Sequence, residues 1–451
     1  MKTYSKKTTQ NAWAMYDWAN SVYSLVISSA IFPIYYEAST KSSEMINGEL
    51  VSSNMVEFMG REFVNTALIG YAGAVGFVIV SLLMPMFSGV ADYLGRKRFF
   101  LRLFSTIGAL GCIGLYFFDA STTNGLQGTI VVYAIALIGF WLSLVFYNSY
   151  LPEIAPREEQ DKLSAKGFSF GYVGSVILLS TILALYLGGG MDIKLGFVMT
   201  GIWWLGFTQW SLFVLPAGES KKFTSTAVLS KGFRELKHVW KVVKSTVRLK
   251  RYTRAFFVYS MGVQTVMLVA AYFAAKEIDW PDDDSKTKGL IISILLIQLI
   301  AIPGAYVMSN MSAKMGNVKA LIIVNVFWVI LCIGAILIHT PNEFYVMAAF
   351  VGFVMGGIQS LSRSTFSKFI PEVRDTASYF SFYDVSEKIG LAIGLFMFAY
   401  LEEVGTMNSG VSETALSGMR LSIVSLVVFF VVGIILLLRV PKEEVAISVE
   451  V

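Results

Sequence analysis

Four polar side chains near the start of the chain have the spacing of one helical face. Asp17, Asn20, Ser21 and Ser24 lie within an otherwise apolar stretch, and residues three or four positions apart share one side of a helix. A carboxylate beside an amide and two hydroxyls can take part in transport, by holding a small polar solute or a proton, or in gating. Asp17 lies near one end of this stretch, where it can equally be water-exposed near the membrane surface, cap a helix or pair structurally, so a transport or gating role and a structural role both remain open.

A second group of charges lies in an apolar stretch near the end of the chain. Asp384 and Lys388 are four positions apart, which lets opposite charges neutralise each other on a helix. Glu387 would then need a partner or a proton, which suits proton coupling, and a static charge network is the alternative. Arg363 could hold a substrate carboxylate through its forked guanidinium, or pair with Asp384 or Glu387 to close a gate, which we favour.

Neutral amides in the apolar stretches are further candidates for holding a solute, because they both donate and accept hydrogen bonds. They are Asn148, Gln264, Gln298 and Gln359. Cys112 and Cys332 also fall in apolar stretches, where packed thiols are expected rather than a disulfide. The sequence has no metal-ligand helix, nucleophile elbow or phosphate-binding glycine loop, so we predict no metal site, no cofactor and no enzymatic activity.

The elements that must carry these residues are membrane-spanning helices. Hydrophobic residues make up 55% of the 451 and charged residues only 15%, against about 25% charged residues in soluble domains. This composition argues against a soluble enzyme, a disordered chain and a secreted disulfide scaffold. A spanning helix needs about 20 mostly apolar residues. Twelve stretches qualify: 13–36, 63–88, 99–118, 128–150, 167–188, 196–216, 253–275, 287–309, 319–339, 344–366, 378–401 and 417–438.

The distribution of positive charge predicts the orientation of these spans. An even number of spans puts both termini on one side, and most of the 36 Lys and Arg residues lie in segments on that side. The positive-inside rule makes that side cytoplasmic. We therefore predict a multi-pass integral membrane protein with cytoplasmic N- and C-termini. No cleavable signal peptide is expected, because no small-residue cleavage site follows the polar start.

The longest cytoplasmic connection divides the spans six and six. The predicted fold is all-α, with a six-helix bundle over 1–216, a basic linker over 217–252 and a second six-helix bundle over 253–451. Five apolar residues of the linker share a helical stripe, with lysines beside it: Phe233, Leu236, Trp240, Val243 and Val247. Such an amphipathic helix can lie on the anionic inner membrane surface or pack beneath the bundles, and both readings stay open.

The two halves repeat each other in sequence. The run Leu-Pro-Glu-Ile at 151–154 follows the fourth span, and Ile-Pro-Glu-Val at 370–373 follows the tenth. Gly-Phe-Ser-Phe at 167–170 opens the fifth span, and Tyr-Phe-Ser-Phe at 379–382 opens the eleventh. The repeat predicts two pseudo-symmetric bundles. Transporters built from repeats commonly place the substrate near the midplane between them.

The connection between the second and third spans carries the most specific motif. It reads Gly89-Val90-Ala91-Asp92-Tyr93-Leu94-Gly95-Arg96-Lys97-Arg98. Gly89 allows close helix approach, and Gly95 allows a tight turn. Asp92 can accept hydrogen bonds from a helix N-terminus or pair with an arginine. The basic residues Arg96, Lys97 and Arg98 can meet lipid phosphates and fix the loop inside.

This run resembles the Gly-x-x-x-Asp-x-x-Gly-Arg-Lys/Arg signature of the major facilitator superfamily. The resemblance implies that the motif is a gating latch and not a substrate site, and that spans one, four, seven and ten line a central cavity. The matching connection in the second half, 310–319, keeps Gly316 and Lys319 but has Ala313 where Asp92 would lie. A latch there would be degraded.

The runs 13–23, 147–154 and 356–364 resemble the autophagy-related vacuole-effluxer branch of that superfamily. Its fungal members are associated with amino-acid efflux from the vacuole, and its bacterial members are mostly unassigned. The resemblance implies a monomeric secondary transporter, in a bacterial cytoplasmic membrane, that moves a small solute by alternating access. Amino-acid efflux and proton-coupled exchange are the expected modes. Anionic lipids are expected partners and nucleic acid is not; a non-transporting sensor or scaffold is the alternative.

Overall fold

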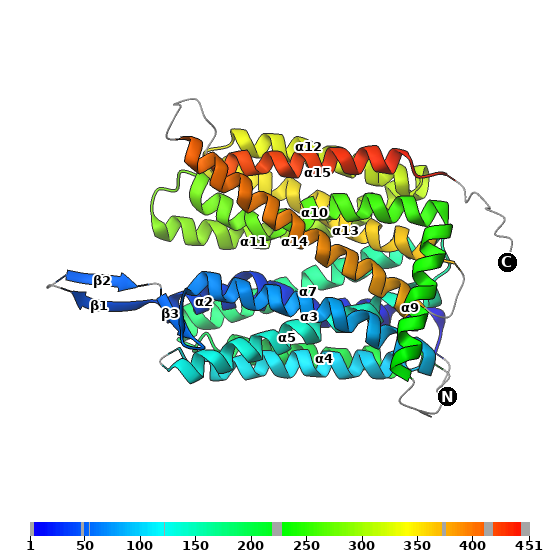
Figure 1. The fold of residues 1–451 in the computed structure, drawn as a ribbon, viewed down its shortest axis with the longest axis horizontal. Coiled ribbons are helices and arrows are strands. Elements are labelled where there is room, and N and C mark those ends of the chain that lie inside the picture. Colours follow the sequence, from blue (N-terminus) through cyan, green and yellow to red (C-terminus); the bar gives the residue numbers. More distant parts are fainter. Residues whose placement is uncertain are drawn as a thin grey trace.

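The computed structural model describes residues 4–46, 49–53, 55–120, 122–218, 228–371, 376–409 and 418–442. Long helices run side by side along one axis, with the first half of the chain on one side and the second half on the other (Figure 1). The first and the last of the described residues lie at the same end, which we call the terminus end. Two β-hairpins mark the opposite end, which we call the hairpin end.

The first half forms the spans one to six. Its first span is a continuous helical run in three parts, and short η2 and α6 follow the third and fourth spans. The elements are α1 (Lys6–Val22), the π-helix η1 (Tyr23–Ala30), α2 (Ile31–Thr40), α3 (Asn65–Leu94), α4 (Lys97–Gly114), η2 (Leu115–Phe117), α5 (Thr123–Ser149), α6 (Leu151–Ile154), α7 (Gln160–Gly189) and α8 (Leu195–Val214).

The second half forms spans seven to twelve after a connecting helix, α9 (Val228–Ser245). Its spans are α10 (Val247–Glu277), α11 (Asp283–Met315), α12 (Asn317–Leu337), α13 (Pro341–Phe369), α14 (Thr376–Ser409) and α15 (Gly418–Leu438). In the described ranges, ten helices are long and apolar enough to cross a bilayer. The run α1–η1–α2 and α14 complete the twelve, so the predicted all-α polytopic fold with two six-helix bundles is confirmed.

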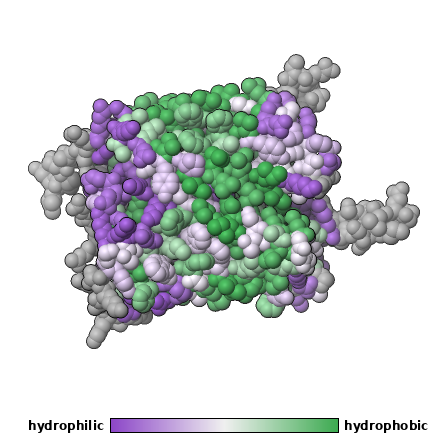
Figure 2. Space-filling view, turned by 180° about the vertical axis from the view of Figure 1, so that it is seen from behind, coloured by the Kyte–Doolittle hydropathy of each residue, from purple (hydrophilic) through white to green (hydrophobic). Residues whose placement is uncertain are grey.

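The surface matches this membrane architecture. Figure 2 shows apolar residues across the middle of one face of the molecule, with hydrophilic residues gathered towards both ends. Large apolar side chains on the long helices are also exposed, among them Leu82 of α3 and Phe396 of α14, each 69% exposed. In water such a surface would be unstable, whereas lipid tails cover it.

Two features differ from the prediction. The first span is longer than the predicted 13–36, because Ser5 caps α1 by accepting a hydrogen bond from the backbone of Thr8 and polar residues then continue the helix. The segment after it also contains strands, which were not predicted because they form no long apolar run. They pair antiparallel as two hairpins: β1 (Ser42–Ile46) with β2 (Glu49–Ser53), and β3 (Met55–Phe58) with β4 (Arg61–Val64).

The N-terminal ends of α1 and α7 contact each other. Lys6 donates to Glu159, which precedes α7, at 2.6 Å, and Gln10 donates to the same carboxylate at 2.9 Å. The hydrogen bond from Lys6, followed by that from Gln10, holds the pKa of the Glu159 carboxyl below its usual range. The pair is exposed, so its contribution to stability is small.

Glycines allow α11 and α13 to pack backbone to backbone. A Cβ at Gly304 would lie 2.0 Å from the carbonyl oxygen of Phe353, and one at Gly356 would lie 2.1 Å from that of Ala301. No side chain fits at such separations. Gly356 therefore allows close packing of α13 against α11, as small residues do at helix interfaces.

The connecting helix α9 lies across the terminus end of the bundle, against α3, α10 and α14 (Figure 1). Val239 and Val243 are buried, and the ring of Trp240 packs on that of Phe382 at 5.1 Å. Val243 of the apolar stripe thus faces protein, which favours packing beneath the bundles, although Trp240 stays 44% exposed. Val247 of the predicted stripe already begins α10. The side chains of Phe233 and Leu236 lie outside the described residues.

Candidate functional site: a cavity between the two halves

A cavity of about 180 Å³ lies between the halves, lined by α1, η1, α5 and α7 from the first half and by α10, α11, α13 and α14 from the second. The structure brings almost all of the sequence candidates to it. The lining includes Asp17, Asn20, Ser21, Ser24, Asn148, Gln264, Gln298, Gln359, Arg363, Asp384 and Glu387. The spacing argument for the face of the first span is thereby confirmed.

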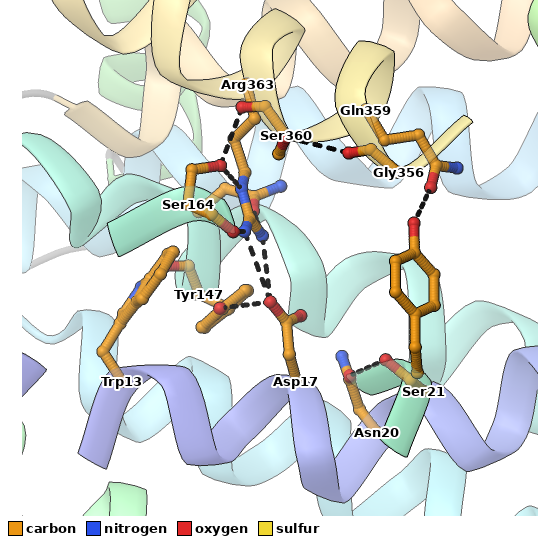
Figure 3. Close-up of polar contacts among 12 residues, drawn as sticks. Trp13, Asp17, Asn20, Ser21, Tyr147, Ser164, Gly356, Gln359, Ser360 and Arg363 are labelled. Atoms are coloured by element: carbon orange, nitrogen blue, oxygen red, sulfur yellow. Dashed lines mark hydrogen bonds and ion pairs between the residues drawn. The ribbon is translucent and has the colours of Figure 1, made fainter. Parts of the chain in front are cut away.

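An ion pair between the halves closes the terminus side of this cavity. The Arg363 guanidinium, on α13, contacts the Asp17 carboxylate, on α1, at 3.2 Å, and the Tyr147 hydroxyl donates to the same carboxylate oxygen at 2.6 Å (Figure 3). Both charged side chains are only 4% exposed. The alternative that Asp17 is water-exposed near the membrane surface is wrong.

Arg363 has no N–H left for another ligand in this conformation. An arginine side chain offers five N–H donors. Its donors bond to both the hydroxyl and the backbone carbonyl of Ser164, twice to Asp17, and to the Asn148 side chain. The expected pairing of Arg363 with Asp384 or Glu387 is therefore wrong, because α1 and α7 enclose the guanidinium from the other half.

Aromatic rings and a glycine shape the enclosure of the guanidinium. The Phe168 ring lies 4.1 Å and the Trp13 ring 4.8 Å from its central carbon, and arginine stacks favourably on such rings. A Cβ at Gly167 would lie 2.5 Å from Asp17 Oδ2 and 3.0 Å from Arg363 Nη2. Only glycine leaves room for the pair here.

The charges of α14 pair differently from the predicted i,i+4 contact. The Lys388 ammonium contacts the Glu387 carboxylate at 2.6 Å and lies 3.3 Å from the centre of the Trp141 ring on α5. Gln264 donates to the other Glu387 oxygen at 2.6 Å. The prediction that Lys388 neutralises Asp384 and leaves Glu387 without a partner is thus wrong. The ammonium thus contacts Glu387 and the face of Trp141.

Two weaker, neutral contacts lie on the hairpin side of the ion pair, one between the halves and one within α1. The Tyr172 hydroxyl, on α7, donates to Gln359 Oε1, on α13, at 2.7 Å. The Ser21 hydroxyl lies 3.5 Å from Asn20 Oδ1. These neutral contacts can exchange for a ligand at low cost, because each is worth about 1 kcal/mol.

The glycine–aspartate motif lies at the terminus end, where it connects the halves. Asp92 accepts hydrogen bonds from the backbone N–H groups of Ala377 and Ser378 at 3.3 and 2.8 Å, and from the Ser378 hydroxyl at 2.9 Å. These groups begin α14, so the carboxylate also meets the positive end of a helix dipole. Gly95 ends α3 with φ of 62°, the left-handed turn expected of it.

The basic residues of the motif have separate roles. Lys97 is buried and bonds to Asp92, Glu153 and Thr376, so the expected contact of Lys97 with lipid phosphate is wrong. Arg98 donates to the backbone of Leu215 at 3.0 Å, and Arg96 is exposed. We call Asp92, Lys97, Glu153 and the start of α14 the first latch.

A second set of bonds joins the halves at the pseudo-symmetric place. Asp161, in the first turn of α7, accepts from Ser312 at 2.7 Å, Asn317 at 2.7 Å and Lys368 at 2.6 Å. We call these four residues the second latch. The expectation of a degraded contact at 310–319 needs correction: the acidic residue lost at Ala313 is supplied by α7 instead. Sequence reasoning missed Asp161 because it lies in a connection outside the apolar runs.

The chain can be compared with known proteins. The sequence profile of the family described as "Vacuole effluxer Atg22 like" matches residues 5–447. The uncharacterized MFS-type transporter YxiO of Bacillus subtilis is 28% identical, over 98% of this chain and 96% of its own. Autophagy-related protein 22 of Eremothecium gossypii is 23% identical, over 85% and 83% of the two chains.

Solved structures show the same fold at low sequence identity. The human organic anion transporter MFSD10 (TETRAN) aligns with a TM-score of 0.66 and 12% identity, over 96% of this chain and 98% of its own. The E. coli fucose:proton symporter FucP aligns with a TM-score of 0.60 and 14% identity, over 97% and 98%. Family and fold are those of transporters and not of enzymes. The chain belongs to the vacuole effluxer Atg22-like family and has the major facilitator superfamily fold.

Proposed function

We propose that the protein is a secondary active transporter that moves a small solute by alternating access, with amino acids as the first candidates. One observation carries this proposal: a polar, charged cavity lies between two pseudo-symmetric halves, and bonds between the halves close its terminus side. A cavity of about 180 Å³ is small beside drug-sized sites of roughly 300–1,000 Å³, which supports a small solute.

The transport cycle requires the halves to separate at the terminus end and to approach at the hairpin end. In that step the Asp17–Arg363 pair and both latches break, and their charges meet water. We propose that the terminus end is cytoplasmic, on the positive-inside rule, and that the conformation is closed towards the cytoplasm. The exposed lysines of α9, such as Lys237 and Lys241, would then meet anionic lipid. We further propose that the protein is a monomer and that its membrane is a bacterial cytoplasmic membrane.

Proton coupling is proposed on two of the carboxylates that line the cavity. Asp17 and Glu387 both reach it, and their ion pairs with Arg363 and Lys388 change environment when the halves separate. Protonation would release Arg363 or Lys388 from its partner. A proton gradient could thus favour one conformation over the other.

Solute counterflow into proteoliposomes tests this function. Vesicles are loaded with a panel of labelled amino acids, and exchange is measured with and without a pH gradient. Asp17→Asn and Glu387→Gln are expected to abolish pH-driven flux while some exchange survives. Glu402→Gln is the matched control, because Glu402 makes an exposed pair with Lys276. Unchanged pH dependence in both cavity variants removes these residues as coupling sites.

The result also separates the transporter from the alternative. Absence of flux for every solute, with folded protein in the vesicles, contradicts the transporter. Saturable thermal stabilisation by a solute without flux would support a sensor or scaffold on a transporter fold.

A further inference from the structure

The cavity contains a carboxylate whose bonding is incomplete. Asp384 is only 4% exposed, it lines the cavity, and its Oδ2 atom is buried without a hydrogen-bond partner in the described residues. An unpaired buried carboxylate oxygen is costly. A ligand that donates to this atom therefore gains more than its own hydrogen bond.

The cationic side chains near Asp384 are committed to other carboxylates. Arg363 uses its donors on Asp17, Ser164 and Asn148, and Lys388 contacts Glu387. Three carboxylates therefore face two cations around the cavity when all are ionised. One further positive charge would balance the site, and it would contact Asp384, the carboxylate without a cationic partner in the described part of the chain.

Four buried polar atoms without partners among the described residues lie on the two sides of the cavity. From the first half, Asn20 Nδ2 donates and the Ser175 hydroxyl can donate or accept, whereas Gln298 Oε1 and Asp384 Oδ2, from the second half, accept. All four residues line the cavity. The arrangement fits a solute with a cationic donor towards α14 and a hydrogen-bond acceptor towards α1 and α7.

The chemistry favours an organic cation over a metal ion. Among the described residues, no three His, Cys, Asp or Glu side chains gather as a metal site would require. A primary ammonium needs only a carboxylate and one or two neutral acceptors, which Asp384 and Gln298 provide.

We propose that Asp384 binds the ammonium group of the transported solute. This inference rests on the proposed transport function and specifies its substrate class: solutes with a protonated amine, held at their other end by the neutral donors Asn20 and Ser175. A carboxylate on the solute would therefore meet neutral groups and not Arg363 in this conformation.

Matched ligands and variants test the assignment. Purified protein is screened by thermal stabilisation against the twenty amino acids, and the best binder is compared with its 2-hydroxy acid and with the amine lacking its carboxyl group. Wild type is expected to lose about 10- to 100-fold affinity for the hydroxy acid, as for loss of a charged hydrogen bond. The amine should retain measurable binding.

The variants must reproduce this discrimination. Asp384→Asn is expected to weaken amino-acid binding by a similar factor while binding the hydroxy acid as wild type does, and Asp384→Glu should restore part of the preference. Glu402→Gln, on the same helix, is the control for loss of a carboxylate. Equal affinity of wild type for the amino acid and the hydroxy acid overturns the assignment, even if both are transported.

Counterflow separates this failure from failure of the proposed function. If solutes are transported without any preference for an amine, the protein is a transporter but Asp384 does not bind an ammonium group. Amine-dependent binding without flux keeps the site and contradicts transport. Loss of pH dependence in Asp384→Asn with an unchanged preference for the amine would mean that Asp384 takes a proton instead, and overturns the assignment.

Discussion

At the scale of single residues, the Asp17–Arg363 pair is the contact whose energy can be tested most directly. Removing one member of a buried ion pair leaves an uncompensated charge and typically costs about 3–5 kcal/mol, whereas removing both costs much less. Asp17→Asn and Arg363→Gln are each expected to lower the melting temperature of the purified protein. The double variant should be more stable than the sum of the two effects predicts.

An exposed pair provides the comparison for this cycle. Lys276 and Glu402 contact each other at 2.8 Å with the Lys276 side chain 63% exposed, so Lys276→Gln with Glu402→Gln should change stability by less than about 1 kcal/mol. If the Asp17 and Arg363 effects simply add, the two side chains are not energetically coupled, and the pair does not hold the halves together.

The charged residues of the site could be found from sequence, but their partners could not. Asp17 and Arg363 stood out because charges are costly in an apolar span. Their contact joins residues 346 positions apart, and no local spacing indicates it. Local spacing misled for Asp384 and Lys388, since it ignored the ring of Trp141. Tyr147 and Gly167 carry no charge, and only their presence in the family-like and repeated runs marked them.

At the scale of helices, the second latch predicts how α7 is held against the second half. Asp161→Asn keeps the size of the side chain but removes the charge that Lys368 contacts at 2.6 Å. The terminus end should then open more often. A cysteine at Ser360 reports this, because Ser360 is 1% exposed and its carbonyl accepts a bond from Ser164 of the other half.

The measurement uses thiol labelling in detergent on a background without Cys112 and Cys332. Labelling of Ser360→Cys is expected to rise about tenfold in the Asp161→Asn variant, which corresponds to a shift of about 1.4 kcal/mol towards the open state. Glu158→Gln, three positions away and exposed, should leave the rate unchanged. Equal rates in all three proteins would show that the second latch does not hold the closed state.

The helices were predictable where the membrane dictates them. Bilayer thickness and apolar runs indicated the spans, and the repeat indicated their division into halves. The hairpins β1–β4 were not predictable in this way, because residues 42–64 mix polar and apolar residues and contain no long apolar run. Whether α9 packs against lipid or against protein was also not predictable, because the same apolar stripe can contact either and only tertiary packing decides.

At the scale of the whole molecule, alternating access predicts reciprocal exposure of the two ends. Ser24 lines the cavity on the hairpin side of the Asp17–Arg363 pair, whereas Ser360 is buried in the closed contact between the halves. In intact bacterial cells, a membrane-impermeant thiol reagent should label Ser24→Cys from outside and leave Ser360→Cys unlabelled. Inside-out vesicles should expose Ser360→Cys only while the terminus end is open.

A transported solute changes the two labelling rates in opposite directions, because one conformational equilibrium controls both ends. Solute that stabilises the state open at the terminus end should slow labelling of Ser24→Cys and speed labelling of Ser360→Cys by the same factor. Labelling of Ser24→Cys only in inside-out vesicles would reverse the assigned orientation. Rates that respond to solute at one end alone would indicate a local rearrangement of the cavity, and the two halves would then not move as rigid bodies about it.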